Sequence, residues 1–96
     1  MKIIDAHLHF WPGHGHFDEL ALEAGHENTA GHLKTVYQDL DISFGIVMGN
    51  RGLSPKEHEY PGFLRYCIGV DRGYLKDHSL TETYDLLEEN LKRREC

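Results

Sequence analysis

Hydrophobic positions along the chain fall into three short apolar runs. The runs cover residues 2–8, 44–48 and 64–70 and are separated by polar segments that contain Gly and Pro. Short apolar runs with such boundaries predict β-strands. The second run, Phe44-Gly45-Ile46-Val47-Met48, is almost continuously apolar, which is typical of a strand buried on both faces.

Two segments between and after these runs have helical periodicity. Thr29 is a candidate N-cap for a helix with apolar residues at i, i+3, i+4 and i+7. Those residues are Leu33, Val36, Tyr37 and Leu40. Ser79-Leu80-Thr81-Glu82 reads as a capping box for a second helix. Its apolar stripe consists of Leu80, Tyr84, Leu87 and Leu91.

Shorter helical pieces are expected at residues 17–24 and 55–59. Strands that alternate with helices predict a parallel α/β fold, because parallel strands need a crossover connection. The 96 residues carry a formal net charge of −6, with 40% hydrophobic and 27% charged residues. This composition predicts one globular domain, and the acidity argues against nucleic acid or an anionic membrane as a partner.

The chain contains no apolar stretch near the ~20 residues of a membrane-spanning helix. Polar residues interrupt its early apolar run, so no signal peptide is expected. Cys67 and Cys96 are too few for a disulfide framework, and a reduced, cytoplasmic protein is the expectation. Cys67 lies within the third apolar run and is predicted to be a small buried residue.

The strongest chemical signal is Asp5-Ala6-His7-Leu8-His9 in the first predicted strand. Alternation along a strand sends Asp5, His7 and His9 to one side. It sends Ile4, Ala6, Leu8 and Phe10 to the other. The two histidine backbones then lie about 6–7 Å apart, so that both imidazoles can bind one metal ion. The alternative is a pair of histidines satisfied by hydrogen bonds in a buried strand.

The segment Ile3-Ile4-Asp5-Ala6-His7-Leu8-His9-Phe10-Trp11 resembles the first-strand motif of the amidohydrolase superfamily. The form Asp-Ala-His-x-His-Phe-Trp is most similar to the amidohydrolase-related branch, which includes decarboxylases, lactone hydrolases and amide hydrolases. The resemblance implies a TIM-like (β/α)8 barrel in which His7 and His9 bind a divalent metal, Zn²⁺ or alternatively Mn²⁺ or another ion. It also implies later histidine ligands and a late aspartate as ligand and general base.

A barrel of this kind needs about 250 residues. We therefore expect residues 1–96 to form a single partial domain: the first three βα units of a barrel, with a parallel sheet, outer helices and an open edge. Two histidines are fewer than the three protein ligands usual in a catalytic zinc site. The expected function is the N-terminal part of a metal-dependent hydrolase or decarboxylase that is inactive as the 96-residue chain alone.

Further candidates lie where the predicted strands end, since that edge of a parallel barrel carries the chemistry. Trp11 is a candidate pocket wall or a packing residue, and Asn50 with Arg51 could bind a substrate carboxylate or form a turn. Asp71 is a candidate for binding substrate, or else a turn residue. For Asp5 we expect a supporting hydrogen bond rather than a bond to the metal.

The other histidines carry weaker signals. His14-Gly15-His16 repeats the spacing of the strand pair, but Pro12 and Gly15 predict a loop. Three interpretations of this loop remain open: a solvated flexible loop, a second metal site, or a lid whose histidines contact substrate. The remaining histidines are predicted to lie on the surface, namely His26, His32, His58 and His78.

Two classes of function remain open. The first is the enzyme, acting on a small-molecule substrate without nucleic acid or membrane. The second is a non-catalytic α/β module that binds a partner, or another copy of itself, through the open sheet edge and retains weak metal affinity.

Overall fold

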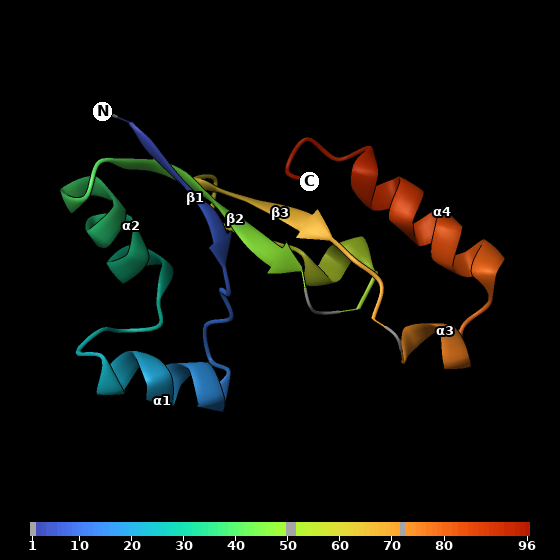
Figure 1. The fold of residues 1–96 in the computed structure, drawn as a ribbon, viewed down its shortest axis with the longest axis horizontal. Coiled ribbons are helices and arrows are strands. Elements are labelled where there is room, and N and C mark those ends of the chain that lie inside the picture. Colours follow the sequence, from blue (N-terminus) through green and yellow to red (C-terminus); the bar gives the residue numbers. More distant parts are fainter. Residues whose placement is uncertain (1, 50–51, 72) are drawn as a thin grey trace.

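The computed structural model describes residues 2–49, 52–71 and 73–96 of the chain. It confirms a small α/β fold with a parallel sheet in the order β1-β2-β3 (Figure 1). The elements in chain order are β1 (Ile3–Leu8), α1 (Gly15–Glu23), α2 (Ala30–Asp39), β2 (Ile42–Gly49), the 3-10 helix η1 (Pro55–Glu57), β3 (Leu64–Ile68), α3 (Tyr74–Asp77) and α4 (Leu80–Leu91).

Both predicted N-caps are present. The Thr29 hydroxyl accepts a hydrogen bond from the His32 amide at 3.2 Å, and the Ser79 hydroxyl accepts one from the Glu82 amide at 3.1 Å. Each bond satisfies a backbone N–H that the first helical turn leaves without a partner. Within the described ranges, no helix is long and apolar enough to cross a membrane.

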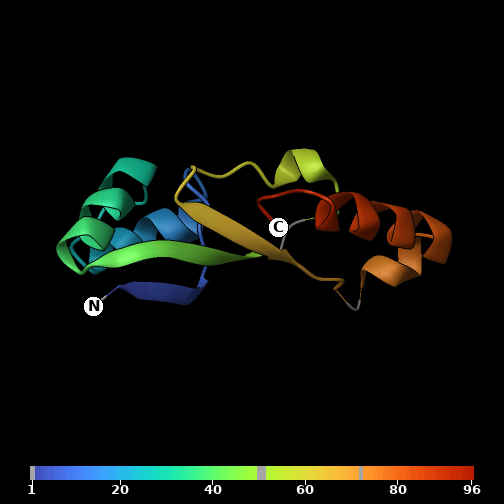
Figure 2. The same ribbon diagram turned by 90° about the horizontal axis from the view of Figure 1, so that it is seen from above.

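The helices cover one face of the sheet and leave the other open. Figure 2 shows α2 and η1 on the same side of the three strands. We call the side under these helices the covered face. The buried residues of β2 and β3 stand at every second position and lie on this face. It carries Gly45, Val47, Gly49, Leu64 and Tyr66. Side chains on the opposite, open face remain partly or fully exposed, namely Ile4, Phe44, Ile46, Met48, Arg65 and Cys67.

This arrangement corrects two predictions. β2 is not buried on both faces, because Phe44, Ile46 and Met48 have no helix over them among the described elements. Cys67 is exposed on the open face rather than buried, since it alternates with the buried Tyr66. The apolar run 44–48 therefore did not reveal whether helices cover β2 on both faces or on one face only.

β1 contains a bulge that changes the predicted faces. Asp5 pairs with Gly45 and Leu8 pairs with Val47, so three steps on β1 match two on β2. Asp5 and Leu8 consequently both lie on the covered face, while Ala6 and His7 share the opposite side. The prediction that Asp5 shares a face with His7 and His9 is therefore wrong.

His58 is also different from its prediction. It is buried, with 1% of its surface exposed, and its ring stacks on Tyr66 with centroids 4.8 Å apart. Its Nε2 lies 2.7 Å from the Gly52 carbonyl oxygen, which accepts a hydrogen bond from it, and its Nδ1 lies 3.1 Å from the Tyr60 hydroxyl. Two partners let a polar ring remain in the core.

The helix α4 is held by polar rather than apolar residues. Asn90 is fully buried, and its amide nitrogen donates to the carbonyls of Leu53 at 2.7 Å and Leu86 at 2.8 Å. Its side-chain oxygen accepts the Tyr66 hydroxyl at 2.7 Å. Most of the predicted apolar stripe is instead exposed: Leu80 (59%), Tyr84 (64%) and Leu91 (67%). Leu40, predicted to pack in the stripe of α2, is 58% exposed as well.

Replacing Asn90 tests this account of α4. Asn90→Ala should lower the free energy of unfolding by about 2–4 kcal/mol, because the buried Leu53 carbonyl and Tyr66 hydroxyl each lose a partner. Urea denaturation measures the change. Glu89→Ala, at the exposed neighbouring position, is the matched control and should stay within about 0.5 kcal/mol of the parent. A loss below about 1 kcal/mol for Asn90→Ala would contradict the role of this contact.

The open face leads to a second prediction. We expect the 96-residue chain to self-associate through the edge of β1 and the open face, since exposed apolar strands promote pairing between chains. Ile4→Lys, at a position 51% exposed on β1, should shift size-exclusion elution toward the monomer without lowering the melting temperature. Leu22→Lys, at a position 77% exposed on α1, should leave the elution unchanged. A parent that elutes as a sharp monomer would show the expectation to be wrong.

Candidate metal centre

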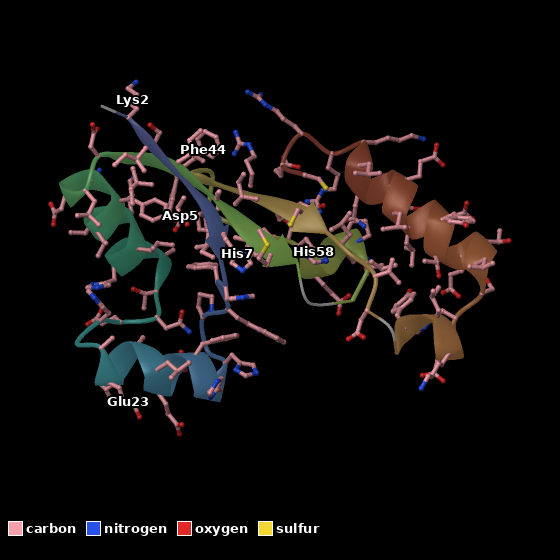
Figure 3. All side chains as sticks on the ribbon, in the orientation of Figure 1. Lys2, Asp5, His7, Glu23, Phe44 and His58 are labelled. Atoms are coloured by element: carbon pink, nitrogen blue, oxygen red, sulfur yellow. The ribbon has the colours of Figure 1, made fainter. Side chains whose placement is uncertain are left out.

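The structure brings His7 and His9 together at the C-terminal end of β1. Their ring centroids lie 5.3 Å apart with the planes 80° from parallel. Both side chains are exposed, and Figure 3 shows His7 near the end of the strand with Asp5 before it. Both rings are therefore accessible to solvent.

Packing of the alternate residues holds this orientation. Leu8 packs against the hydrophobic core, and Phe10 belongs to the core with 9% of its surface exposed. Because Leu8 points into the covered face, the preceding His7 points away from it. His9 follows the end of β1 and stacks with Phe17 of α1. The bulge before Leu8 separates Asp5 from the pair.

The separation of the two ring centroids can be compared with that of two imidazoles on one metal ion. Two imidazoles bound to one tetrahedral zinc, at about 2.0–2.1 Å per bond, would have ring centroids about 5.2 Å apart. The observed separation is 5.3 Å. No group of three or more His, Cys, Asp or Glu side chains that could hold a metal occurs among residues 2–49, 52–71 and 73–96. The pair can therefore supply two ligands, with water or other groups completing the coordination.

Asp5 supports the strand rather than the rings. Its Oδ2 accepts a hydrogen bond from the Tyr37 hydroxyl at 2.8 Å, and its Oδ1 accepts one from the His7 backbone N–H at 3.3 Å. The carboxylate thus binds the bulged backbone next to a candidate ligand. Burial raises the pKa of Tyr37 above its usual value, and the hydrogen bond and negative charge of Asp5 raise it further.

The second histidine pair lies at the start of a helix rather than in a loop. His14 is the N-cap residue of α1 and His16 stands in its first turn. Phe17 contacts three histidine rings, with centroid distances of 6.2 Å to His9, 5.0 Å to His14 and 5.7 Å to His16. The Nδ1 atom of His14 is buried and has no hydrogen-bond partner. Phe17 thus lies between His9 and the two histidines of the second pair.

The remaining predicted site residues separate into two places. Trp11 borders a pocket of about 70 Å³ together with His9 and Met48, and its ring lies 4.5 Å from that of His14. Asp71 borders another pocket of about 370 Å³ beyond the ends of β2 and β3. Its Oδ1 accepts a hydrogen bond from the Gly73 amide at 2.9 Å, as a turn residue does. Asn50 and Arg51 lie outside the described residues.

The larger pocket contains two residues that the sequence analysis did not propose as site residues. Met48 and Cys67 line its wall, and the Cys67 thiol donates to the Met48 sulfur at 3.7 Å. Alternation along the third strand could have indicated that Cys67 lies on the face opposite to Tyr66, because the two residues are adjacent. The apolar residues on both sides of Cys67 instead suggested that it is buried.

Comparison with protein-family models, with curated proteins and with solved structures gives no match for this chain. The assignment of function therefore depends on the geometry of the described residues and on the first-strand motif.

Tyr37→Phe tests the link between α2 and β1. A phenol with a raised pKa in the folded state stabilises the protein fully below its unfolded pKa of about 10, and this stability falls as the pH rises above that value. Tyr37→Phe should therefore lower stability at neutral pH by about 1–3 kcal/mol and weaken its decline above pH ~10. Chemical denaturation at several pH values measures both effects.

Tyr84→Phe provides the matched control for this experiment. Tyr84 is 64% exposed on α4, so its replacement should change stability at neutral pH by no more than about 0.5 kcal/mol. Equal effects of the two substitutions would show that the contact between Tyr37 and Asp5 does not hold β1.

Proposed function

We propose that the chain forms the first βα units of a metal-dependent, amidohydrolase-related enzyme with a (β/α)8 barrel. The observation that carries this proposal is the approach of the His7 and His9 rings to 5.3 Å at the C-terminal end of β1. Active sites of such barrels lie at this end of the strands. The motif around the two histidines resembles the first strand of that superfamily.

The one-sided sheet supports the same proposal. In a barrel, helices cover the outer face of the sheet, and side chains from all strands fill the interior. This chain has α2 and η1 on one side, and it leaves Ile4, Phe44 and Ile46 partly or largely exposed on the other. Further strands would bury that open face and surround the histidine pair.

In this proposal each residue has a defined task. Neutral imidazoles of His7 and His9 bind the metal, and Asp5 fixes the His7 backbone through its N–H. Trp11 forms a pocket wall beside His9. The metal, when bound, activates water or polarises a carbonyl, which suits hydrolysis of an amide, lactone or ester, or a decarboxylation.

The complete site needs more groups than this pair provides. Catalytic zinc sites usually take three protein ligands, and the resemblance implies later histidines and an aspartate that acts as general base. We therefore propose that the 96 residues bind metal but do not catalyse the reaction alone. The two-ligand site also favours a second candidate function, a non-catalytic module that binds metal weakly.

The metal-binding step has a direct test. Addition of Zn²⁺ should shift the imidazole ¹⁵N signals of His7 and His9, which nuclear magnetic resonance resolves for each histidine. His7→Ala should abolish most of the response of His9, and the converse should also hold, because one imidazole alone binds zinc weakly. Acidification should reverse the shifts, since protonated imidazole cannot bind the metal.

The matched control is the double variant His14→Ala/His16→Ala, which should retain most of the response of His7 and His9. If zinc shifts His14 and His16 while His7 and His9 stay unchanged, the strand pair is not the metal site. The enzyme proposal would then lose its physical support.

A further inference from the structure

A third pair of histidines, His26 and His32, meets between α1 and α2, away from the sheet. The Nδ1 atom of His26 lies 2.8 Å from the Nε2 atom of His32, and the ring centroids are 5.1 Å apart. His26 is exposed and His32 is half-buried. Neither ring belongs to the group of histidines around Phe17.

The backbone holds both histidines in place independently of their rings. Gly25 adopts a left-handed φ of +78° after α1, and the His26 amide then donates to the Ala21 carbonyl at 2.8 Å. The His32 amide donates to the Thr29 hydroxyl at 3.2 Å. The two rings are therefore presented by two helix termini with satisfied caps.

The segment between the two histidines is fixed as well. The Asn28 amide nitrogen donates to the Trp11 carbonyl at 2.9 Å and to the Asp18 carboxylate at 2.7 Å. Asp18 also accepts the Gly13 amide at 3.3 Å. Asn28 thus links the connection that carries His26 to Asp18 of α1 and to the Trp11 main chain. Because this connection is already ordered, a ligand that binds His26 and His32 loses less free energy in fixing the chain.

The two facing nitrogens are the atoms through which the rings would bind a bridging cation. Each of the two nitrogens can present a lone pair when its imidazole is neutral. A hydrogen bond between the two rings contributes only about 0.5–1.5 kcal/mol to stability. Two imidazoles on a tetrahedral zinc ion would have centroids about 5.2 Å apart and nitrogens about 3.3 Å apart. The observed nitrogens lie 2.8 Å apart and face each other across a hydrogen bond, with the centroids 5.1 Å apart. The two nitrogens must therefore separate by about 0.5 Å, and the rings must tilt, to admit the ion.

We propose that His26 and His32 form a second zinc site, separate from the His7–His9 pair, in which Zn²⁺ links the end of α1 to the first turn of α2. His26 binds through Nδ1 and His32 through Nε2. Water completes the coordination, because the described parts of the chain offer no third protein ligand. Zinc bound in this way stabilises the folded state, since the unfolded chain does not hold the two rings together.

The test uses the full chain with His7→Ala/His9→Ala, in which the strand pair is removed. Zn²⁺ should shift Nδ1 of His26 and Nε2 of His32 in imidazole ¹⁵N spectra, and it should raise the melting temperature in a dose-dependent manner. Adding His26→Gln or His32→Gln should each reduce the zinc affinity at least tenfold and remove the rise in melting temperature. His78→Gln, at an exposed position before α4, is the matched control and should change neither readout.

Two results would overturn the proposal. In the first, zinc leaves the His26 Nδ1 and His32 Nε2 signals unchanged, and the contact is then a hydrogen bond alone. In the second, His32 responds equally in the presence of His26→Gln, which would show that the rings do not share an ion. Circular dichroism without zinc confirms that each variant is folded. The outcome is independent of the enzyme proposal, because His7 and His9 are absent from the tested background.

Discussion

The close approach of side chains to β2 determines how the rest of the sheet is arranged. A Cβ atom at Gly45 would collide with the Tyr37 hydroxyl and would lie 2.8 Å from Leu8, so glycine is needed for α2 to pack here. This approach allows the Tyr37 hydroxyl to bind Asp5 on the neighbouring strand. Asp5 is therefore drawn to the covered face, and the bulge that follows it turns His7 to the open face. A missing side chain on β2 thus influences the direction of a candidate metal ligand on β1.

A second glycine on β2 has the same effect at the other end of the strand. A Cβ atom at Gly49 would contact the Cys67 carbonyl and would lie 3.2 Å from the His58 ring. His58 can consequently lie flat on Tyr66, with Arg93 5.6 Å from the centre of the same Tyr66 ring. This aromatic stack joins η1, β3 and the end of α4. Its polar atoms are satisfied by main-chain and side-chain partners, so the core tolerates them.

Local signals in the sequence predicted local structure well. Thr29 and Ser79 cap helices as expected, since a cap depends on residues within one turn. Properties that depend on distant partners were not predictable. Asn90 binds the carbonyl of Leu53, 37 positions away, and no periodic pattern indicates such a bond. The bulge in β1 is of the same kind, because the partner strand rather than the β1 sequence determines the pairing register.

The candidate site shows the same division between local and distant causes. The spacing of His7 and His9 in the sequence is enough to expect their rings close together, whereas the His26–His32 contact depends on how α1 ends and α2 begins. Both pairs have ring centroids just over 5 Å apart, at 5.3 Å and 5.1 Å, so ring geometry alone does not distinguish their roles.

Their positions in the fold do distinguish them. His9 borders a pocket with Trp11 and Met48 at the C-terminal end of a parallel sheet, where substrates of barrel enzymes bind. The other pair bridges two helix termini. A metal ion there would stabilise the connection between α1 and α2, whereas an ion on His7 and His9 would lie beside the pocket at the end of the sheet.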